Sequence, residues 1–212
     1  MARRRMNRAS RTTNKRERIL RAAEKEFALR GFEGARVDRI ATAAGLDKAS
    51  LYYYFRSKQE IYNSVLEEAM RKFAEISSAG FERDIDPGEE LAAFVDVLLD
   101  FLNKHKSFAL VLRREFIIPG RSPRGAVYTS LTPLIRRVRR YVQREIEKGE
   151  MRRVDPEHAL YSIFEILFGY FTLNPEAAKI FFDMPPYTKE MIERRKAHVT
   201  DLIRKLLHRL GK

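Results

Sequence analysis

The chain has 212 residues, 44% of them hydrophobic, which is enough for one large or two small domains with a core. It contains no cysteine, which excludes disulfides, thiolate metal sites and cysteine nucleophiles, and no apolar run approaches the roughly 20 residues that cross a bilayer. The net charge of +13 is uneven: residues 1–58 hold 16 Lys and Arg against 6 Asp and Glu (+10), and residues 59–212 hold 26 against 23 (+3).

This charge distribution suits a polyanionic partner, which is a nucleic acid or, as the alternative, an anionic membrane face. The first residues, MARRRMNRASRT, carry five arginines and little that can be buried, so we expect residues 1–13 to form a disordered basic arm. Such an arm can follow phosphates or enter a minor groove, or it can add only unspecific, salt-sensitive affinity. No apolar segment follows it, so we expect no secretory signal and a cytoplasmic protein.

Three helices are predicted next. From Asn14 apolar residues recur on one helical face, and Gly31 provides the left-handed residue that ends many helices. A short helix, about Val37 to Ala44, is followed by Gly45 and by Asp47, a suitable N-cap for a third helix that runs to about residue 55. Two short helices joined by a glycine-containing turn, after a longer amphipathic one, predict a helix-turn-helix unit.

The third helix contains four consecutive aromatic residues, YYYF at 52–55. Because successive helical residues point about 100° apart, they cannot all face a core. Leu51 and Phe55 are four apart and share the buried face, so tyrosines must turn outward. The first turn, residues 48–50, is then the part that meets base edges in a major groove. The alternative, that tyrosines only cover a small core, remains open for Tyr53.

The segment RERILRAAEKEFALRGFEGARVDRIATAAGLDKASLYYYFRSKQEIY resembles the DNA-binding domain of the TetR family of bacterial transcriptional regulators, over about residues 15–65. The matching elements are Ile-Leu-x-Ala-Ala, Phe-x-x-x-Gly-Phe, Ile-Ala-x-x-Ala-Gly and Leu-Tyr-x-Tyr-Phe-x-x-Lys. The resemblance implies contacts with bases or nearby phosphates from Lys48, Ala49, Ser50 and Tyr52, and contacts with the DNA backbone from Tyr53, Tyr54 and Lys58.

The chain departs from the family pattern before the second helix. Ala35 and Arg36 stand where the family usually has Thr followed by Thr or Ser, whose hydroxyls cap the helix and meet phosphate. Arg36 can replace the phosphate contact by its charge, so it joins the predicted DNA-binding set, but the cap is weakened or moved. Asp47 replaces the usual Ser before the third helix and adds a negative charge near DNA.

The remaining sequence is helical in pattern, with no strand-like alternation. Further helices are expected over 58–76, 90–105, 108–118, 124–148 with Pro133 inside, 156–172 and 189–210, with breaks at Pro87-Gly88, Pro119-Gly120 and Pro185-Pro186. We therefore predict an all-α protein with a three-helix helix-turn-helix DNA-binding domain at 14–60 and a helical effector-binding and dimerisation domain at 61–212.

The helix expected at 156–172 is apolar nearly all round, so it needs two burying surfaces and implies a partner chain, unless everything packs within a monomer. The resemblance implies a homodimer through the last two long helices. The interface residues expected there are Ile163, Leu167, Phe171, Val199, Ile203 and Leu206. A dimer would place two recognition helices on successive major-groove faces, so the operator is expected to be an inverted repeat.

The resemblance also implies a small-molecule pocket whose filling weakens DNA binding. The expected lining is Phe94, Leu98, Phe101, Phe108, Leu112, Phe116, Phe164 and Phe168, which can equally fill a solid core. The candidates for polar contacts, which can equally lie on solvated faces, are the carboxylates Asp100, Glu115 and Glu165 and the cations Arg113, Arg114 and Arg137. The composition indicates an apolar or amphipathic effector.

Catalytic motifs are absent from the sequence. The four histidines are scattered, and there is no His-Glu-x-x-His, no phosphate-binding glycine-rich loop and no nucleophile elbow. We therefore expect no enzyme, no metal and no cofactor. The predicted function is a sequence-specific transcriptional regulator, a homodimeric repressor released from its operator by a small hydrophobic effector. The alternative is a non-specific architectural DNA-binding protein without a ligand, which would explain the basic arm but not the helix-turn-helix.

Overall fold

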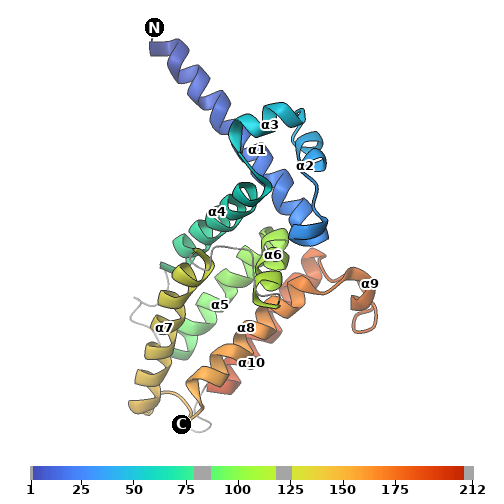
Figure 1. Cartoon of the computed structure of the whole chain (residues 1–212). Helices are drawn as coiled ribbons and strands as arrows, with labels where there is room; N and C mark the ends of the chain where they lie inside the picture. The colour runs from blue at the N-terminus through green and yellow to red at the C-terminus, as the bar shows by residue number, and fades with distance from the viewer. Residues whose placement is uncertain (1, 79–86, 118–125, 208–212) are drawn as a thin grey trace. The chain divides into compact units, whose positions relative to one another are not determined.

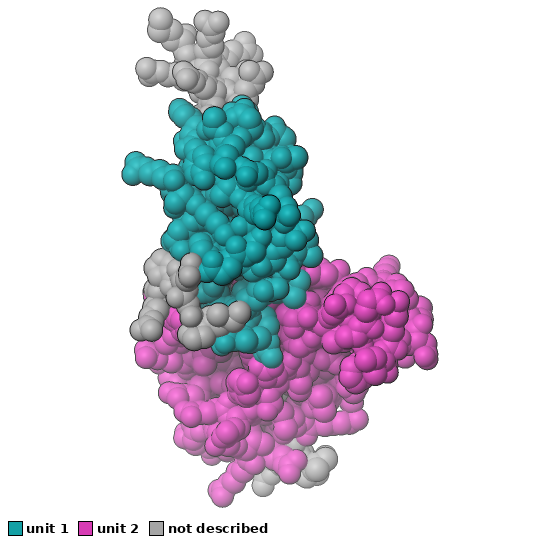
Figure 2. All heavy atoms as spheres, turned by 45° about the vertical axis from the view of Figure 1, so that its right-hand side comes forward, with its two compact units in different colours: residues 1–70, 110–127 teal, residues 71–109, 128–212 magenta. Residues whose placement is uncertain are grey.

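The computed structural model describes residues 2–78, 87–117 and 126–207, with most side chains from Asn14 onward, and no strand forms in these ranges (Figure 1). This confirms the predicted all-α fold. The chain divides into two compact units, Met1–Met70 with Leu110–Val127, and Arg71–Ala109 with Tyr128–Lys212 (Figure 2). Within the described ranges, no helix is both long and apolar enough to cross a membrane.

The first unit is built around one face of α1. It contains α1 (Ala2–Gly34), α2 (Val37–Ala43), α3 (Lys48–Tyr54), the first part of α4 (Lys58–Ser78) and the second part of α6 (Lys106–Ile117). Ile19, Ala23 and Phe27 are spaced four apart on α1 and are all buried, as are Ile40 of α2 and Leu51 of α3. This spacing places the three side chains on one stripe of α1; α2 packs on α1, and α3 packs on α2.

Helix α1 begins earlier than the predicted start at Asn14. The structure continues it back to Ala2, through the segment predicted to be a disordered arm. That segment contains no proline or glycine, and its alanines, arginines and methionine favour a helix, so an anchored helix can extend through it. At the other end, Gly31 has φ 68° and interrupts α1 before its last turn.

The first unit extends past residue 60, where the sequence predicted a domain boundary. Tyr62 of α4 lies edge-on to Phe27 and Phe32, with ring centres 4.8 and 5.1 Å away. Its hydroxyl donates a hydrogen bond to the Glu115 carboxylate of α6. Burial and this carboxylate raise the pKa of Tyr62, so the hydroxyl keeps its proton and remains a donor. These contacts join α4 and α6 to the helix-turn-helix.

The second unit contains the second part of α4, the first part of α6 and all but the start of α7 (Ala126–Glu147). It also contains α5 (Pro87–Lys104), α8 (Pro156–Thr172), α9 (Pro175–Ala178) and α10 (Lys189–Leu207). Helix α10 packs on α5 and on α8. The predicted bounds of α8 are confirmed: Asp155 accepts hydrogen bonds from the backbone N–H groups of Glu157 and His158, and Pro156 occupies the first helical position. The predicted end of the last helix and the break at residues 119–120 lie outside the described residues.

Candidate nucleic-acid interface

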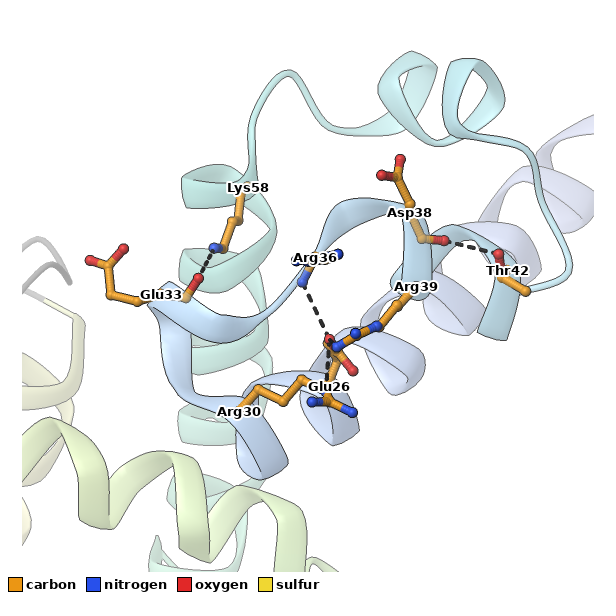
Figure 3. A network of polar contacts seen from close by, with 8 residues as sticks. All are labelled: Glu26, Arg30, Glu33, Arg36, Asp38, Arg39, Thr42 and Lys58. Carbon is orange, nitrogen blue, oxygen red and sulfur yellow. Dashed lines mark hydrogen bonds and ion pairs between the residues drawn. The ribbon is translucent and has the colours of Figure 1, made fainter.

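The start of α2 is held by a carboxylate from α1 (Figure 3). Arg36 is the N-cap residue, but its side chain makes no capping hydrogen bond. Its backbone N–H instead donates to Oε1 of Glu26, at 3.3 Å. The same carboxylate pairs with Arg30 and Arg39, at 3.4 and 3.6 Å, and its side chain is 12% exposed. The hydroxyl cap missing at residues 35–36 is thus replaced from another helix, while Arg36 stays exposed.

The turn between α2 and α3 is closed by backbone hydrogen bonds and by one arginine. Leu46 N–H donates to the Ala41 carbonyl at 2.9 Å, and Gly45 adopts φ 66°. This left-handed conformation is readily available only to glycine. The Arg18 guanidinium of α1 donates to the Ala44 carbonyl, where a cation is favoured by the helix dipole. The turn is therefore fixed to the long helix.

Asp47 caps α3 as predicted. Its Oδ1 accepts from the Ser50 backbone N–H at 2.7 Å, and its Oδ2 accepts from the Ser50 hydroxyl at 2.9 Å. These hydrogen bonds hold the pKa of Asp47 below its ordinary value of 3.8. The next residue, Lys48, pairs with Asp38 of α2 at 2.8 Å, and both side chains are exposed. The two short helices are thus linked at their outer surface.

The cap makes the stability of the first unit depend on pH. Because the folded pKa of Asp47 is depressed, the ionised cap contributes fully above the unfolded pKa and is lost as the pH falls through the folded pKa, below about pH 4. The Asp47→Asn variant keeps a capping oxygen but cannot ionise. As the pH falls through this range, its melting temperature should fall less steeply than that of the wild type. A thermal titration of both proteins measures the difference, and identical pH profiles would contradict this role.

The aromatic run is divided between core and surface as its spacing predicts. Leu51 and Phe55 are 0% and 1% exposed, whereas Tyr52 and Tyr53 are 41% and 80% exposed. Tyr54 is half-buried and its ring lies edge-on to Tyr53, at 5.4 Å. The exposure of Tyr53 rules out the alternative that this residue covers a core. Together with exposed Lys48 and Ala49 and half-buried Ser50, the tyrosines form the outer surface of α3.

Lys58 is engaged within the protein. Its Nζ donates to the Glu33 carbonyl at 3.1 Å (Figure 3). The same atom lies 4.7 Å from the centre of the Phe32 ring. The side chain thereby fastens the start of α4 to the end of α1. Next to it, the Ser57 hydroxyl accepts from the Glu60 N–H at 3.1 Å and fixes the start of α4. The predicted contact of Lys58 with the DNA backbone stays a prediction.

The predicted pocket residues do not all belong to one unit. Leu112 and Phe116 belong to the first unit, and Phe116 is 41% exposed. The other six belong to the second unit, where Leu98, Phe101, Phe108 and Phe168 are buried and Phe94 and Phe164 are half-buried. Phe101 packs edge-on against Phe108 at 5.7 Å and against Phe73 at 5.8 Å. These contacts are those of a packed core.

The predicted dimer residues face their own chain. Ile163, Leu167, Phe171, Val199 and Ile203 are between 0% and 7% exposed, and Leu206 is half-buried. Their place at a dimer interface stays a prediction, because an apolar stripe shows that a face is buried without showing what buries it. The outward sides of α8 and α10 carry other residues, among them Tyr161 and Leu202, which are 63% and 37% exposed.

The contacts of Glu26 and Arg18 were missed by sequence reasoning. A carboxylate and a guanidinium on an amphipathic helix are ordinarily solvated, and their backbone partners lie many residues away in the chain. The weakened cap at Ala35 and Arg36 was the signal that a replacement was needed. In the part of the chain that the structure describes, no group of three or more His, Asp or Glu side chains is placed to hold a metal ion.

Comparisons with known proteins agree with this geometry. The family model "Bacterial regulatory proteins, tetR family" matches residues 19–65, and the model "Tetracyclin repressor-like, C-terminal domain" matches residues 87–203. The transcriptional repressor NicS of Pseudomonas putida is 34% identical over 114 residues, so the match spans about half of each chain, 53% in both cases. The transcriptional regulator RutR of Escherichia coli K12 is 25% identical over 180 residues, which are 81% of this chain and 84% of RutR.

The fold is also shared with solved structures. The TetR family transcriptional regulator PfmR from Thermus thermophilus superposes with a TM-score of 0.69 at 25% identity, over 90% of this chain and 99% of PfmR. The helix-turn-helix, the all-α architecture and both family matches agree, and the second match alone covers more than half of the chain. The chain is a DNA-binding transcriptional regulator and belongs to the TetR family.

Proposed function

We propose that this regulator is a homodimeric, cytoplasmic repressor that binds an inverted-repeat operator and is released by a small hydrophobic effector. The observation that carries the proposal is the outer surface of α3, where an exposed lysine, a small alanine and tyrosine hydroxyls project from a helix fixed by Asp47 and by buried Leu51 and Phe55. Small residues in the first turn allow close approach to base edges, and hydroxyls and cations can bind phosphates. The relative NicS is a transcriptional repressor, which supports repression rather than activation.

A footprint on the DNA upstream of the protein's own gene tests the proposal, at about 0.15 M salt with excess random competitor, because competitor removes the salt-dependent, unspecific contribution. A protected inverted repeat is the expected result. Uniform coverage that disappears with competitor would refute sequence-specific binding at this site and favour the architectural alternative. Protection of a single half-site would refute the dimer.

Lys48→Ala should weaken binding to the operator about 10- to 100-fold while changing affinity for random DNA much less, because a lysine that meets a base edge discriminates between bases. The matched control is Lys179→Ala, which removes another exposed lysine paired with an acid, Glu176, at 2.7 Å. Titrations of both variants on operator and random duplexes measure the effect. An equal loss on both duplexes would make Lys48 a backbone contact.

The outward faces of α8 and α10 are the proposed dimer surface. On α8, Tyr161 and Gly169 lie eight residues apart, hence on the same side, and an added Cβ at Gly169 would meet no atom within 4 Å. On α10, Ala197, His198 and Leu202 are exposed. This surface lies on the same two helices as the apolar stripe that the sequence suggested.

Release by an effector has a structural route through α6. Both α4 and α6 have residues in each unit, and within the first unit the Tyr62 hydroxyl bonds to Glu115. Displacement of α6 by a ligand would act through this bond on α4, which directly follows the recognition helix. A ligand that binds the DNA-incompetent state about 100-fold more tightly can shift the equilibrium by about 2.7 kcal/mol. This is enough to empty an operator when repressor is scarce.

A further inference from the structure

An aromatic cluster in the second unit joins the end of α8 to the segment before α10. The rings of Tyr170 and Tyr187 are 6.0 Å apart and nearly perpendicular, and Phe171 is stacked on Tyr187 at 6.5 Å. The Tyr170 hydroxyl donates to the Pro186 carbonyl, and the Tyr187 hydroxyl donates to the Leu173 carbonyl at 2.9 Å. These hydrogen bonds hold both rings in place, so that charged side chains can pack against the ring faces.

Two cations from different helices lie over these rings. The Cζ atom of Arg195, on α10, is 5.0 Å from the centre of the Tyr170 ring. The Nζ atom of Lys106, the first residue of α6, is 4.7 Å from the centre of the Tyr187 ring. Both side chains are half-buried. Arg195 Nη2 donates to the Ile166 carbonyl at 2.6 Å, but its Nε is buried and has no hydrogen-bond partner in the described structure.

Among the described residues, no carboxylate forms an ion pair with either cation, which distinguishes them from their charged neighbours on α10. Lys196 pairs with Asp96 at 3.2 Å and with Asp100 at 2.9 Å, and Arg204 pairs with Glu89 at 2.6 Å. Burial lowers the pKa of both Lys106 and Arg195, because their charged forms lose water without gaining a counter-charge. The tyrosine faces offset only part of this loss.

We propose that Lys106 and Arg195, positioned by Tyr187 and Tyr170, bind the anionic group of a small amphipathic effector, in the simplest case a carboxylate. A partly buried cation without an anion is unfavourable, and a bound carboxylate would supply the missing charge. Guanidinium N–H groups that the protein does not use can bond to carboxylate oxygens with good geometry. The proposal rests on the proposed function, since it specifies the chemistry of the effector.

The surroundings fit an apolar tail attached to this anion. His105 precedes Lys106, and its ring lies 4.6 Å from Phe101, which belongs to the Phe73–Phe101–Phe108 cluster. Burial and the nearby positive charges of Lys72 and Lys104 lower the pKa of His105. The anion would therefore lie in a positive environment beside aromatic side chains. The alternative is that the two cations only fasten α6 and α10 to the aromatic cluster.

The test uses the full-length protein, straight-chain carboxylates from acetate to dodecanoate and the matching primary amides, which lack the charge. Thermal unfolding identifies the acids that stabilise the protein, and calorimetry measures their Kd. At least one acid should bind about tenfold or more tightly than its amide, as expected for charged hydrogen bonds. Lys106→Gln and Arg195→Gln should each remove this preference. Arg194→Gln, which changes an exposed neighbour on α10, should retain it.

Three outcomes would overturn the inference: no acid in the series stabilises the protein, acids and amides bind equally, or the preference survives both substitutions. Because Arg195 also bonds to α8, its variant can unfold, and Lys106→Gln then decides alone. An operator-release assay with the same acids separates this inference from the proposed function. Acid binding that requires Lys106 and Arg195 without release from DNA would refute effector-released repression and leave the anion site standing.

Discussion

Replacing Phe55 with alanine should lower the free energy of unfolding of the first unit by about 3–5 kcal/mol, the range measured when large buried aromatic side chains are truncated. Phe55 is 1% exposed and ends α3, where its N–H donates to the Leu51 carbonyl at 3.1 Å. The Arg16 guanidinium of α1 lies 5.1 Å from the centre of its ring. Truncation would open a cavity below the recognition helix and remove this contact with α1.

A loss of this size is a large part of the roughly 5–15 kcal/mol that stabilises a typical domain. Operator binding should therefore disappear near physiological temperature, and urea unfolding monitored by circular dichroism should show an earlier transition. Tyr53→Ala is the matched control on the same helix. Because Tyr53 is 80% exposed, its variant should unfold within about 0.5 kcal/mol of the wild type while binding DNA less tightly. Equal destabilisation of both variants would contradict the assigned burial.

Local signals explain why the recognition helix could be predicted closely from sequence. The spacing of Leu51 and Phe55 identified the buried face, and Asp47 was recognised as the N-cap, because both depend on residues within one or two turns. The family resemblance identified the fold and the class of partner. Contacts such as that of Glu26 with the start of α2 depend on which segments meet in three dimensions, which local pattern does not specify.

The second unit shows the limit of hydrophobic pattern more clearly. An apolar stripe on α10 gives the same signal whether its own chain or a partner chain buries it, and α5 and α8 bury it here. For a similar reason, the sequence alone did not point to the cations Lys106 and Arg195. Charged side chains commonly lie near the apolar edge of an amphipathic helix, and only the structure shows that no carboxylate among the described residues pairs with these two.

The proposed dimer surface predicts a second large effect. Gly169→Arg should convert the dimer into a folded monomer and weaken operator binding by roughly 100-fold or more, because each half-site would then be bound separately. Gly169 lies within α8, and a Cβ built there meets no atom within 4 Å, so the substitution should be tolerated inside the chain. Replacing glycine in a helix interior also favours the helix by up to about 1 kcal/mol.

The prediction therefore separates assembly from folding. Sedimentation should give a monomer mass for Gly169→Arg at concentrations where the wild type is a dimer, while its thermal transition within the monomer stays cooperative. Val97→Arg, which places the same charge at a 46% exposed position on α5, should remain dimeric. A dimeric Gly169→Arg protein with normal operator affinity would show that the partner docks elsewhere. Loss of the dimer in both variants would instead indicate a general effect of added charge. The pair of variants therefore decides whether the outward face of α8 is the surface that brings two recognition helices to one operator.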